Sequence, residues 1–277
     1  MTPDQQGSGA TRIEADLSIN QRRKNLMRRA STCLALLGLA VLGFALPGVA
    51  SAAPTVKLVA KAVPIPGYPG TGNILGAGAA VEAKYEIIGT EFTGGVPSPL
   101  THFSFLLPAG TVLHPQGFVT CTAATLENIG PSGCPKKSQA SPVGSAGVVD
   151  VIGGEPVRET ATLQAFFAPG GGLQFYVDAA SPISAQLIAS TGTFGGPGGL
   201  QLSGPIKLIE TVPGAPPVST TSINIKVGSA YKQGKKTVYY GRLPKKCPKG
   251  GFPVKSEFTF LSGESVTSTY KAPCPKK

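Results

Sequence analysis

The residues with the clearest chemistry are the four cysteines that follow residue 53: Cys121, Cys134, Cys247 and Cys274. An even number of cysteines favours disulfides if the chain is exported, and four cysteines allow three pairings. We favour Cys121–Cys134 and Cys247–Cys274, because each pair closes a short segment that contains turn signals. The chain-entropy model gives these crosslinks roughly 3 and 3.5 kcal/mol. A zinc site is the alternative, but structural zinc usually uses close cysteine pairs, and the gaps here are 13, 113 and 27 residues.

The two histidines and the scattered carboxylates give little support to a catalytic site. His102 belongs to a segment, 101–107, in which Phe and Leu alternate, so we expect it on the opposite, solvated face of a strand. His114 precedes a proline and is expected on a loop. No Gly-x-Ser-x-Gly motif marks a nucleophile, and Asp150, Asp178 and the glutamates form no local pair for glycoside cleavage. The enzyme alternative is a hydrolase of an extracellular glycan or ester, with His114 or paired acids assembled only in three dimensions.

Motifs for metals and cofactors are also missing from the sequence. It contains no DxDxDG calcium loop, and neither histidine has a partner at metal-ligand spacing. The glycine runs do not lead from a strand into a helix, so they give no phosphate-binding loop. We therefore predict no metal and no cofactor.

The positive charge of the chain is concentrated in its last quarter. Residues 224–277 carry eleven lysines and one arginine against two glutamates, a balance of +10, whereas residues 54–223 have a balance of −2. Such asymmetry indicates an anionic partner, and lysine in place of arginine favours diffuse attraction. We predict that anionic envelope polymers or acidic glycans, and not nucleic acid, bind six lysines: Lys232, Lys235, Lys236, Lys245, Lys246 and Lys249. The alternative is that these lysines only serve solubility and protect sheet edges.

Residues 27–52 have the pattern of a secretory signal peptide. A basic pair, Arg28-Arg29, precedes an apolar run at 33–46, and the small-residue site Ala50-Ser51-Ala52 follows it. The apolar run is about fourteen residues long, too short for a membrane-spanning helix, which needs roughly twenty. We expect cleavage after Ala52 and a mature chain without a membrane span, either secreted or held at the cell envelope.

The segment before the signal peptide, residues 1–26, is polar and lacks periodicity. We interpret it as a polar leader or as a mis-called start, with Met27 as the true first residue. The pair Arg22-Arg23 permits twin-arginine export as an alternative to the general route, but the expected downstream Phe-Leu is missing. Cys33 lies before the apolar core instead of after it, so lipidation is not expected there.

Period-two alternation recurs along residues 53–277 and predicts an all-β fold. Gly/Pro clusters separate the short apolar runs, which is typical of an antiparallel β-sandwich of the jelly-roll or immunoglobulin-like Greek-key kind, here stapled by disulfides. The expected strands are 55–63, 81–87, 101–107, 146–152, 157–168, 173–177, 183–190, 200–212, 222–231, 235–243, 253–261 and 264–271. The only helix expected is a single turn at most, at 123–128.

Two hairpins are expected in the last quarter of the chain. Ser262-Gly263 is a turn signal between 253–261 and 264–271, and Lys232-Gln233-Gly234 joins 222–231 to 235–243. The proline-rich stretch 213–217 is a crossover between sheets or a linker. We favour one extended domain over 53–277, with a boundary near 213–217 as the alternative, because sixty residues with one disulfide would be marginally stable alone.

Three segments carry a resemblance: 63–92, 159–177 and 223–260, with KKCPKGGFPVK as the most specific stretch. They are similar to an uncharacterised family of secreted, paralogous proteins from high-GC Gram-positive bacteria. The resemblance spans nearly the whole mature chain and implies secretion and an all-β fold. It implies no activity, ligand or catalytic residue.

Together these features predict a secreted, non-catalytic protein of the extracellular space or the cell envelope. We expect a structural or binding module with a basic C-terminal surface.

Overall fold

The computed structural model describes residues 53–180, 182–196 and 199–275. The predicted signal peptide (27–52) and the segment before it (1–26) lie outside the described residues. Of the described residues, 53% are in strands and 6% in helices, and the sheets are antiparallel. The prediction of an all-β chain is therefore confirmed. The described residues all belong to one compact unit.

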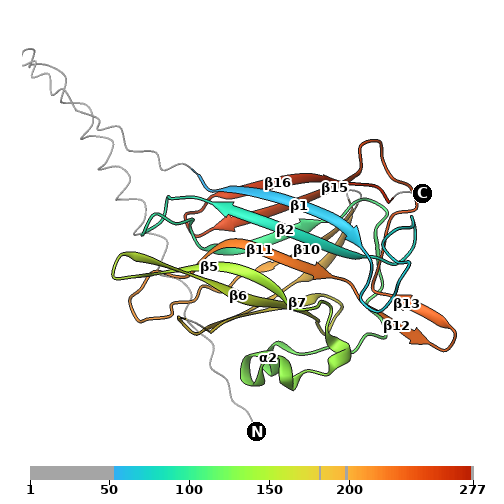
Figure 1. The fold of residues 1–277 in the computed structure, drawn as a ribbon, viewed down its shortest axis with the longest axis horizontal. Coiled ribbons are helices and arrows are strands. Elements are labelled where there is room, and N and C mark those ends of the chain that lie inside the picture. Colours follow the sequence, from blue (N-terminus) through green and yellow to red (C-terminus); the bar gives the residue numbers. More distant parts are fainter. Residues whose placement is uncertain (1–52, 181, 197–198, 276–277) are drawn as a thin grey trace, which may run out of the picture. The chain divides into compact units, whose positions relative to one another are not determined.

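The larger sheet has seven strands. In spatial order they are β1 (Thr55–Val63), β2 (Ala80–Ile88), β11 (Ser219–Val227), β5 (Gly144–Ile152), β6 (Glu155–Phe167), β7 (Leu173–Ala179) and β8 (Ala185–Ser190). Strands β5 to β8 are neighbours both along the chain and in space, whereas β11 comes from late in the sequence and lies between β2 and β5 (Figure 1). One late strand thus joins two earlier parts of the sheet.

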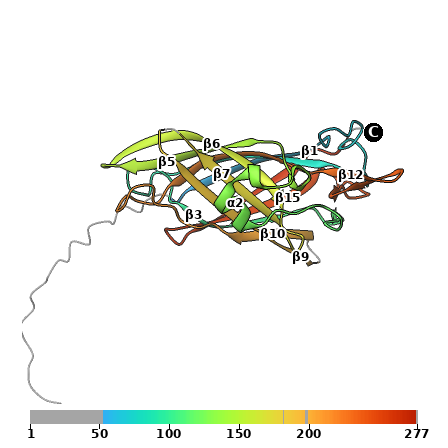
Figure 2. The ribbon, with the colours of Figure 1, turned by 90° about the horizontal axis from the view of Figure 1, so that it is seen from below.

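The second sheet has five strands and packs against the first. In spatial order they are β16 (Ser265–Ala272), β15 (Phe252–Phe260), β3 (Leu100–Leu106), β10 (Gly199–Pro205) and β9 (Gly192–Gly196). Two short ladders pair β12 (Ala230–Gln233) with β13 (Lys236–Tyr239), and β14 (Gly241–Arg242) with β4 (Val112–Leu113). Figure 2 shows the two large sheets as two layers.

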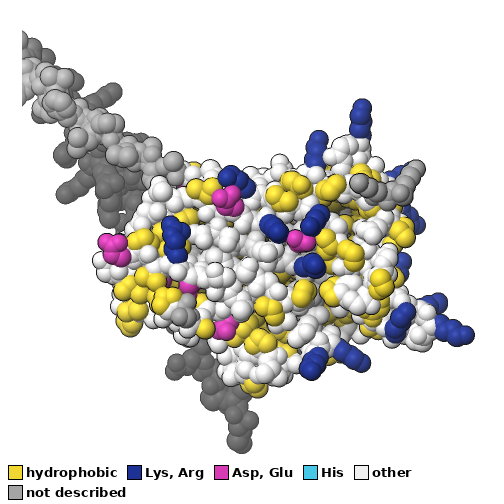
Figure 3. Space-filling view, in the orientation of Figure 1, with side chains coloured by type: hydrophobic (Ala, Val, Ile, Leu, Met, Phe, Trp, Pro, Cys, Tyr) yellow, Lys and Arg dark blue, Asp and Glu magenta, His cyan; other side chains and the backbone are white. Residues whose placement is uncertain are grey.

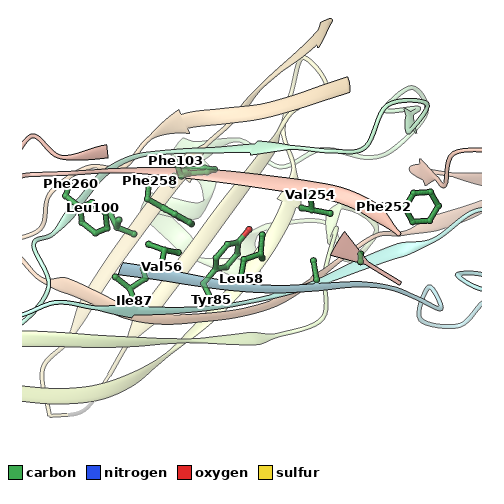
Figure 4. Close-up of a cluster of buried hydrophobic side chains, with 13 residues drawn as sticks. Val56, Leu58, Tyr85, Ile87, Leu100, Phe103, Phe252, Val254, Phe258 and Phe260 are labelled. Carbon is green, nitrogen blue, oxygen red and sulfur yellow. The ribbon is translucent and has the colours of Figure 1, made fainter. Parts of the chain in front are cut away.

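The core lies between these layers because alternate residues of each strand point inward. In β1, Val56, Leu58 and Ala60 are buried, while most of the residues between them are exposed. From β2, the ring of Tyr85 meets the ring of Phe258 of β15 edge-on, with 5.1 Å between ring centroids (Figure 4). Burial between the sheets raises the pKa of the Tyr85 hydroxyl above its ordinary range. The two sheets therefore share one apolar core.

The helical element is longer than predicted. Helix α2 (Ala123–Ile129) has seven residues, where the sequence indicated one turn at most, and the short 3₁₀ turns η1 (Pro131–Gly133) and η2 (Lys136–Ser138) follow it. Thr122 caps the N-terminus of α2 by accepting a hydrogen bond at Oγ1 from the Thr125 amide at 3.1 Å. The second turn is stabilised because Leu126 is fully buried beside Phe166 and Tyr176.

The predicted hairpin between 222–231 and 235–243 forms only near its turn, where 230–233 pair with 236–239. Residues 222–227 belong to β11, which pairs with β2 and β5, so they are not available for a hairpin with the second segment. Gly228 follows β11 directly with φ of +154°, and a Cβ at this position would clash with the backbone of Ala80. Only β12 and β13 remain to form a shorter hairpin.

The predicted strand 200–212 is too long at its C-terminal end. β10 stops at Pro205, whose nitrogen has no hydrogen to donate, and the chain then crosses from the five-stranded sheet to β11 in the seven-stranded sheet. The proline-rich stretch 213–217 lies within this crossover.

Candidate functional site at the basic end

The first half of the predicted lysine site lies on the β12–β13 hairpin. Gly234 and Lys235 form its two-residue loop, and Gly234 has φ of +59°, a conformation that glycine adopts without strain. Lys232, Lys235 and Lys236 are all exposed. The ammonium of Lys232 donates a hydrogen bond to Oγ1 of Thr237, its cross-strand neighbour, at 2.8 Å. The hairpin thus presents three cations on a short, regular support.

The second half of the predicted site lies on the loop between β14 and β15. Lys245, Lys246 and Lys249 are exposed on this loop, and Cys247 within it forms a disulfide with Cys274, with 6.0 Å between the two Cα atoms. The loop ends at Gly251, where a Cβ would lie 2.5 Å from the carbonyl oxygen of Ala272 in β16. A disulfide and a close backbone contact therefore hold the loop against β16.

The fold brings both lysine groups to one end of the described unit. β14 lies between the hairpin and the loop in the chain and therefore joins them. The loop is also held to the segment before β2, because the carbonyl of Pro244 accepts a hydrogen bond from the amide of Gly76 at 3.1 Å. In Figure 3, dark-blue side chains gather along the edge where Figure 1 places β12, β13 and the C-terminal end. We call this surface the basic end and define it by the six predicted lysines together with Arg242 and Lys271.

Few negative charges offset the basic end. Residues 228–252, which supply seven of its eight cations, contain no Asp or Glu. Within the described ranges the lysines in salt bridges are Lys57, Lys61, Lys84 and Lys255, none of them part of the basic end. The guanidinium of Arg242 lies 5.5 Å from the ring centroid of Tyr239. These cations therefore project an uncompensated positive field into solvent.

Sequence reasoning missed Arg242 and Lys271 as members of this surface. Arg242 belongs to the two-residue strand β14, which pairs with β4 far away in the sequence. Lys271 lies near the end of β16, and its side chain comes within 3.8 Å of the position a Cβ would take at Gly250. The charge excess of residues 224–277 indicates a basic surface. It does not show which strands pair, and this pairing is what places Arg242 and Lys271 beside the six lysines.

The other disulfide lies apart from the lysine loop, beside α2. Cys121 and Cys134 are bonded, with 5.5 Å between their Cα atoms, and both are buried against Phe166. The four cysteines thus form the two pairs that the sequence favours.

The residues considered for catalysis are dispersed. His102 is half-buried on β3, between Pro205 of β10 and Thr259 of β15, and His114 is exposed after β4. Asp150 is buried and accepts hydrogen bonds from Thr211 Oγ1 and from the amide of Val151. Its carboxylate therefore anchors the crossover to β5. In the described part of the chain, no hydrogen bond joins a histidine side chain to a serine.

Burial raises the pKa of Tyr176, and the neighbouring carboxylate of Asp178 adds to this effect. Tyr176 and Asp178 are two residues apart in β7, so their side chains lie on the same face of the strand.

Metal-binding clusters and membrane-spanning helices are both missing from the described residues. Among them, no group of three or more His, Cys, Asp or Glu side chains is arranged to hold a metal ion. No helix within 53–180, 182–196 and 199–275 has both the length and the apolar character needed to cross a membrane.

Comparison with known proteins gave no relative. No family model, no curated protein and no solved structure matches this chain.

Proposed function

We propose that this protein is a secreted, non-catalytic binding module of the extracellular space or cell envelope, and that its basic end binds anionic polymers. The observation that carries the proposal is the meeting of the hairpin lysines and the loop lysines at one end, without acidic partners. Envelope polymers and acidic glycans are the partners expected outside the cell. Nucleic acid is not expected there.

Two further expectations belong to this proposal. The first is the architecture: two packed antiparallel sheets support a β-sandwich, and we propose the jelly-roll or immunoglobulin-like kind. The second is the location, since two disulfides suit an oxidising compartment. We also keep as a hypothesis the resemblance to secreted paralogous proteins of high-GC Gram-positive bacteria.

Attraction by exposed lysines is expected to depend steeply on salt. The Debye length is about 8 Å at physiological ionic strength and about 3 Å at 1 M, so salt screens charges that are not in close contact. The purified protein is expected to bind alginate, an acidic polysaccharide, in low salt and to lose most of this binding by about 0.5 M salt. Binding is measured by retention on immobilised alginate at increasing salt.

Neutral dextran, immobilised in the same way, is the control. Equal retention on both polysaccharides, or retention on alginate that does not change with salt, would contradict electrostatic binding. No retention on alginate even in low salt would leave the lysines as a solvated surface.

A further inference from the structure

The two sheets do not fill the space between them. A cavity of about 250 Å³ lies there, lined by residues of both sheets that include Ala83, Tyr85, Phe105, Phe175 and Ile223. Protein interiors are packed as densely as organic crystals and have few voids larger than a water molecule. An engineered apolar cavity of about 150 Å³ stays dry and takes up benzene. The cavity here is larger, and its wall is almost entirely apolar.

The side chains in the wall show the same incomplete packing. Phe103 and Phe258 are 4% and 1% exposed. Phe105, Phe175 and Ile223 line the same space and pack against the same core, yet each is only partly buried. Figure 4 shows Tyr85 extending from the lower sheet toward Phe103 and Phe258 of the upper one. The apolar surface that these inward-facing residues leave uncovered suits an apolar ligand.

The charged residues of the wall all have one sign. They are Lys61, Lys207 and Arg242, all exposed, so the wall reaches the surface at basic residues, and it includes no Asp or Glu. Lys61 is paired with Glu82 at 3.4 Å, whereas Lys207 and Arg242 have no salt bridge among the described residues. Arg242 also belongs to the basic end, which strengthens the positive potential at that opening.

A buried hydroxyl lies close to Arg242 in the chain. Tyr240, two residues before it, also lines the cavity, and its Oη is buried without a hydrogen-bond partner in the described structure. Buried polar groups normally have a partner. Burial raises the pKa of Tyr240 to about 12, so the phenol keeps its proton at neutral pH. The hydroxyl can therefore donate a hydrogen bond to an acceptor group of a ligand.

We propose that the space between the two sheets binds an anionic single-chain amphiphile of the fatty-acid type, with its chain among the apolar side chains and its headgroup at Arg242. Charge complementarity selects the anionic headgroup, and the apolar wall selects the chain. This site goes beyond the proposed binding of polymers, because it uses the interior of the protein and not the six surface lysines.

Titration of the purified protein with three ligands of equal chain length tests the headgroup. Dodecanoate, dodecanol and dodecylammonium are used below their micelle concentrations, and dissociation constants are measured by calorimetry. Dodecanoate is expected to bind at least about tenfold more tightly than dodecylammonium. Equal affinity for these two ions, or no binding of dodecanoate, would overturn the proposal. Dodecyl phosphate is run beside them, and its affinity relative to dodecanoate distinguishes a phosphate from a carboxylate headgroup; either preference supports the site.

Matched variants test the location. Ala83→Phe fills the cavity from β2 and is expected to weaken dodecanoate binding at least about tenfold, while Val59→Phe adds the same ring at a half-exposed position of β1 and is expected to leave binding unchanged. Arg242→Gln is expected to weaken binding by up to about fivefold, as for an exposed ion pair, and Arg158→Gln, an exposed arginine outside the cavity wall, is expected to have no effect. Ala83→Leu, a smaller change, replaces Ala83→Phe if the latter does not fold.

If Ala83→Phe loses dodecanoate binding but keeps alginate binding, dodecanoate binds in the cavity and not at the surface lysines of the basic end. Unchanged dodecanoate affinity in the folded Ala83 variants would place the ligand on the outer surface and overturn the proposal.

Discussion

Replacement of Phe258 by Ala is expected to lower the free energy of unfolding by about 3–5 kcal/mol, as for other Phe→Ala changes in protein cores. Phe258 is 1% exposed and lies in β15, between β16 and β3. Its ring contacts Tyr85 from the other sheet and Phe105 from the neighbouring strand, at centroid distances of 5.1 and 6.0 Å. The variant loses these contacts and extends the cavity that Phe258 already lines.

Urea unfolding followed by circular dichroism measures this loss. The matched control is Phe194→Ala on β9, because the Phe194 side chain is 57% exposed. The control is expected to lose less than about 1 kcal/mol, as for other surface changes. Similar losses in both variants would contradict the packing of the two sheets around Phe258.

Removal of the Cys247–Cys274 disulfide is expected to cost about 3.5 kcal/mol by the chain-entropy model for a closed segment of this length. The crosslink spans 27 residues, and the β15–β16 hairpin lies inside that segment. The double variant Cys247→Ala with Cys274→Ala is compared with wild type by urea unfolding without reductant. The corresponding variant at Cys121 and Cys134 is expected to lose slightly less, about 3 kcal/mol, because its segment is shorter.

The double variant at Cys247 and Cys274 also tests whether alginate binding needs a fixed geometry of the lysine loop or only its charge. The disulfide holds the lysine loop, but diffuse attraction depends on charge density and little on exact position. Retention on alginate is therefore expected to change less than about twofold. A large loss of retention in the folded variant would show that a fixed loop geometry is required.

The sequence predicts a strand well where its alternation of apolar and polar residues and the residues that end it lie close together in the chain. β1 was expected at 55–63 and is found there, because its alternation and the flanking prolines suffice to define it. β15 and β16 lie within one residue of their expected ends, since Ser262-Gly263 sets the turn between two alternating segments. The two cysteine pairs were accessible for a similar reason, as each joins residues close in the chain.

The sequence does not predict features that depend on distant pairing. The alternation of β11 identifies a strand, but its neighbours β2 and β5 come from far earlier in the chain, and the nearby turn signal suggested a hairpin instead. The cavity is equally hidden, because Phe103 and Phe105 occupy equivalent positions in one alternating segment. Phe103 is buried and Phe105 is only partly buried, a difference that the alternation of the segment does not indicate.

The central claim, that the basic end binds anionic polymers, is tested most directly by retention on alginate of three variants with equal loss of charge. The hairpin variant replaces Lys232, Lys235 and Lys236 by Gln, and the loop variant does so with Lys245, Lys246 and Lys249. The control variant replaces Lys57, Arg158 and Lys207, which are exposed and lie outside the basic end.

In low salt, each of the first two variants is expected to bind alginate about tenfold more weakly, which corresponds to roughly 0.5 kcal/mol for each exposed lysine. The control variant is expected to bind within about twofold of wild type. Equal losses in all three variants would show that net charge alone drives binding, and would contradict a binding site at the basic end.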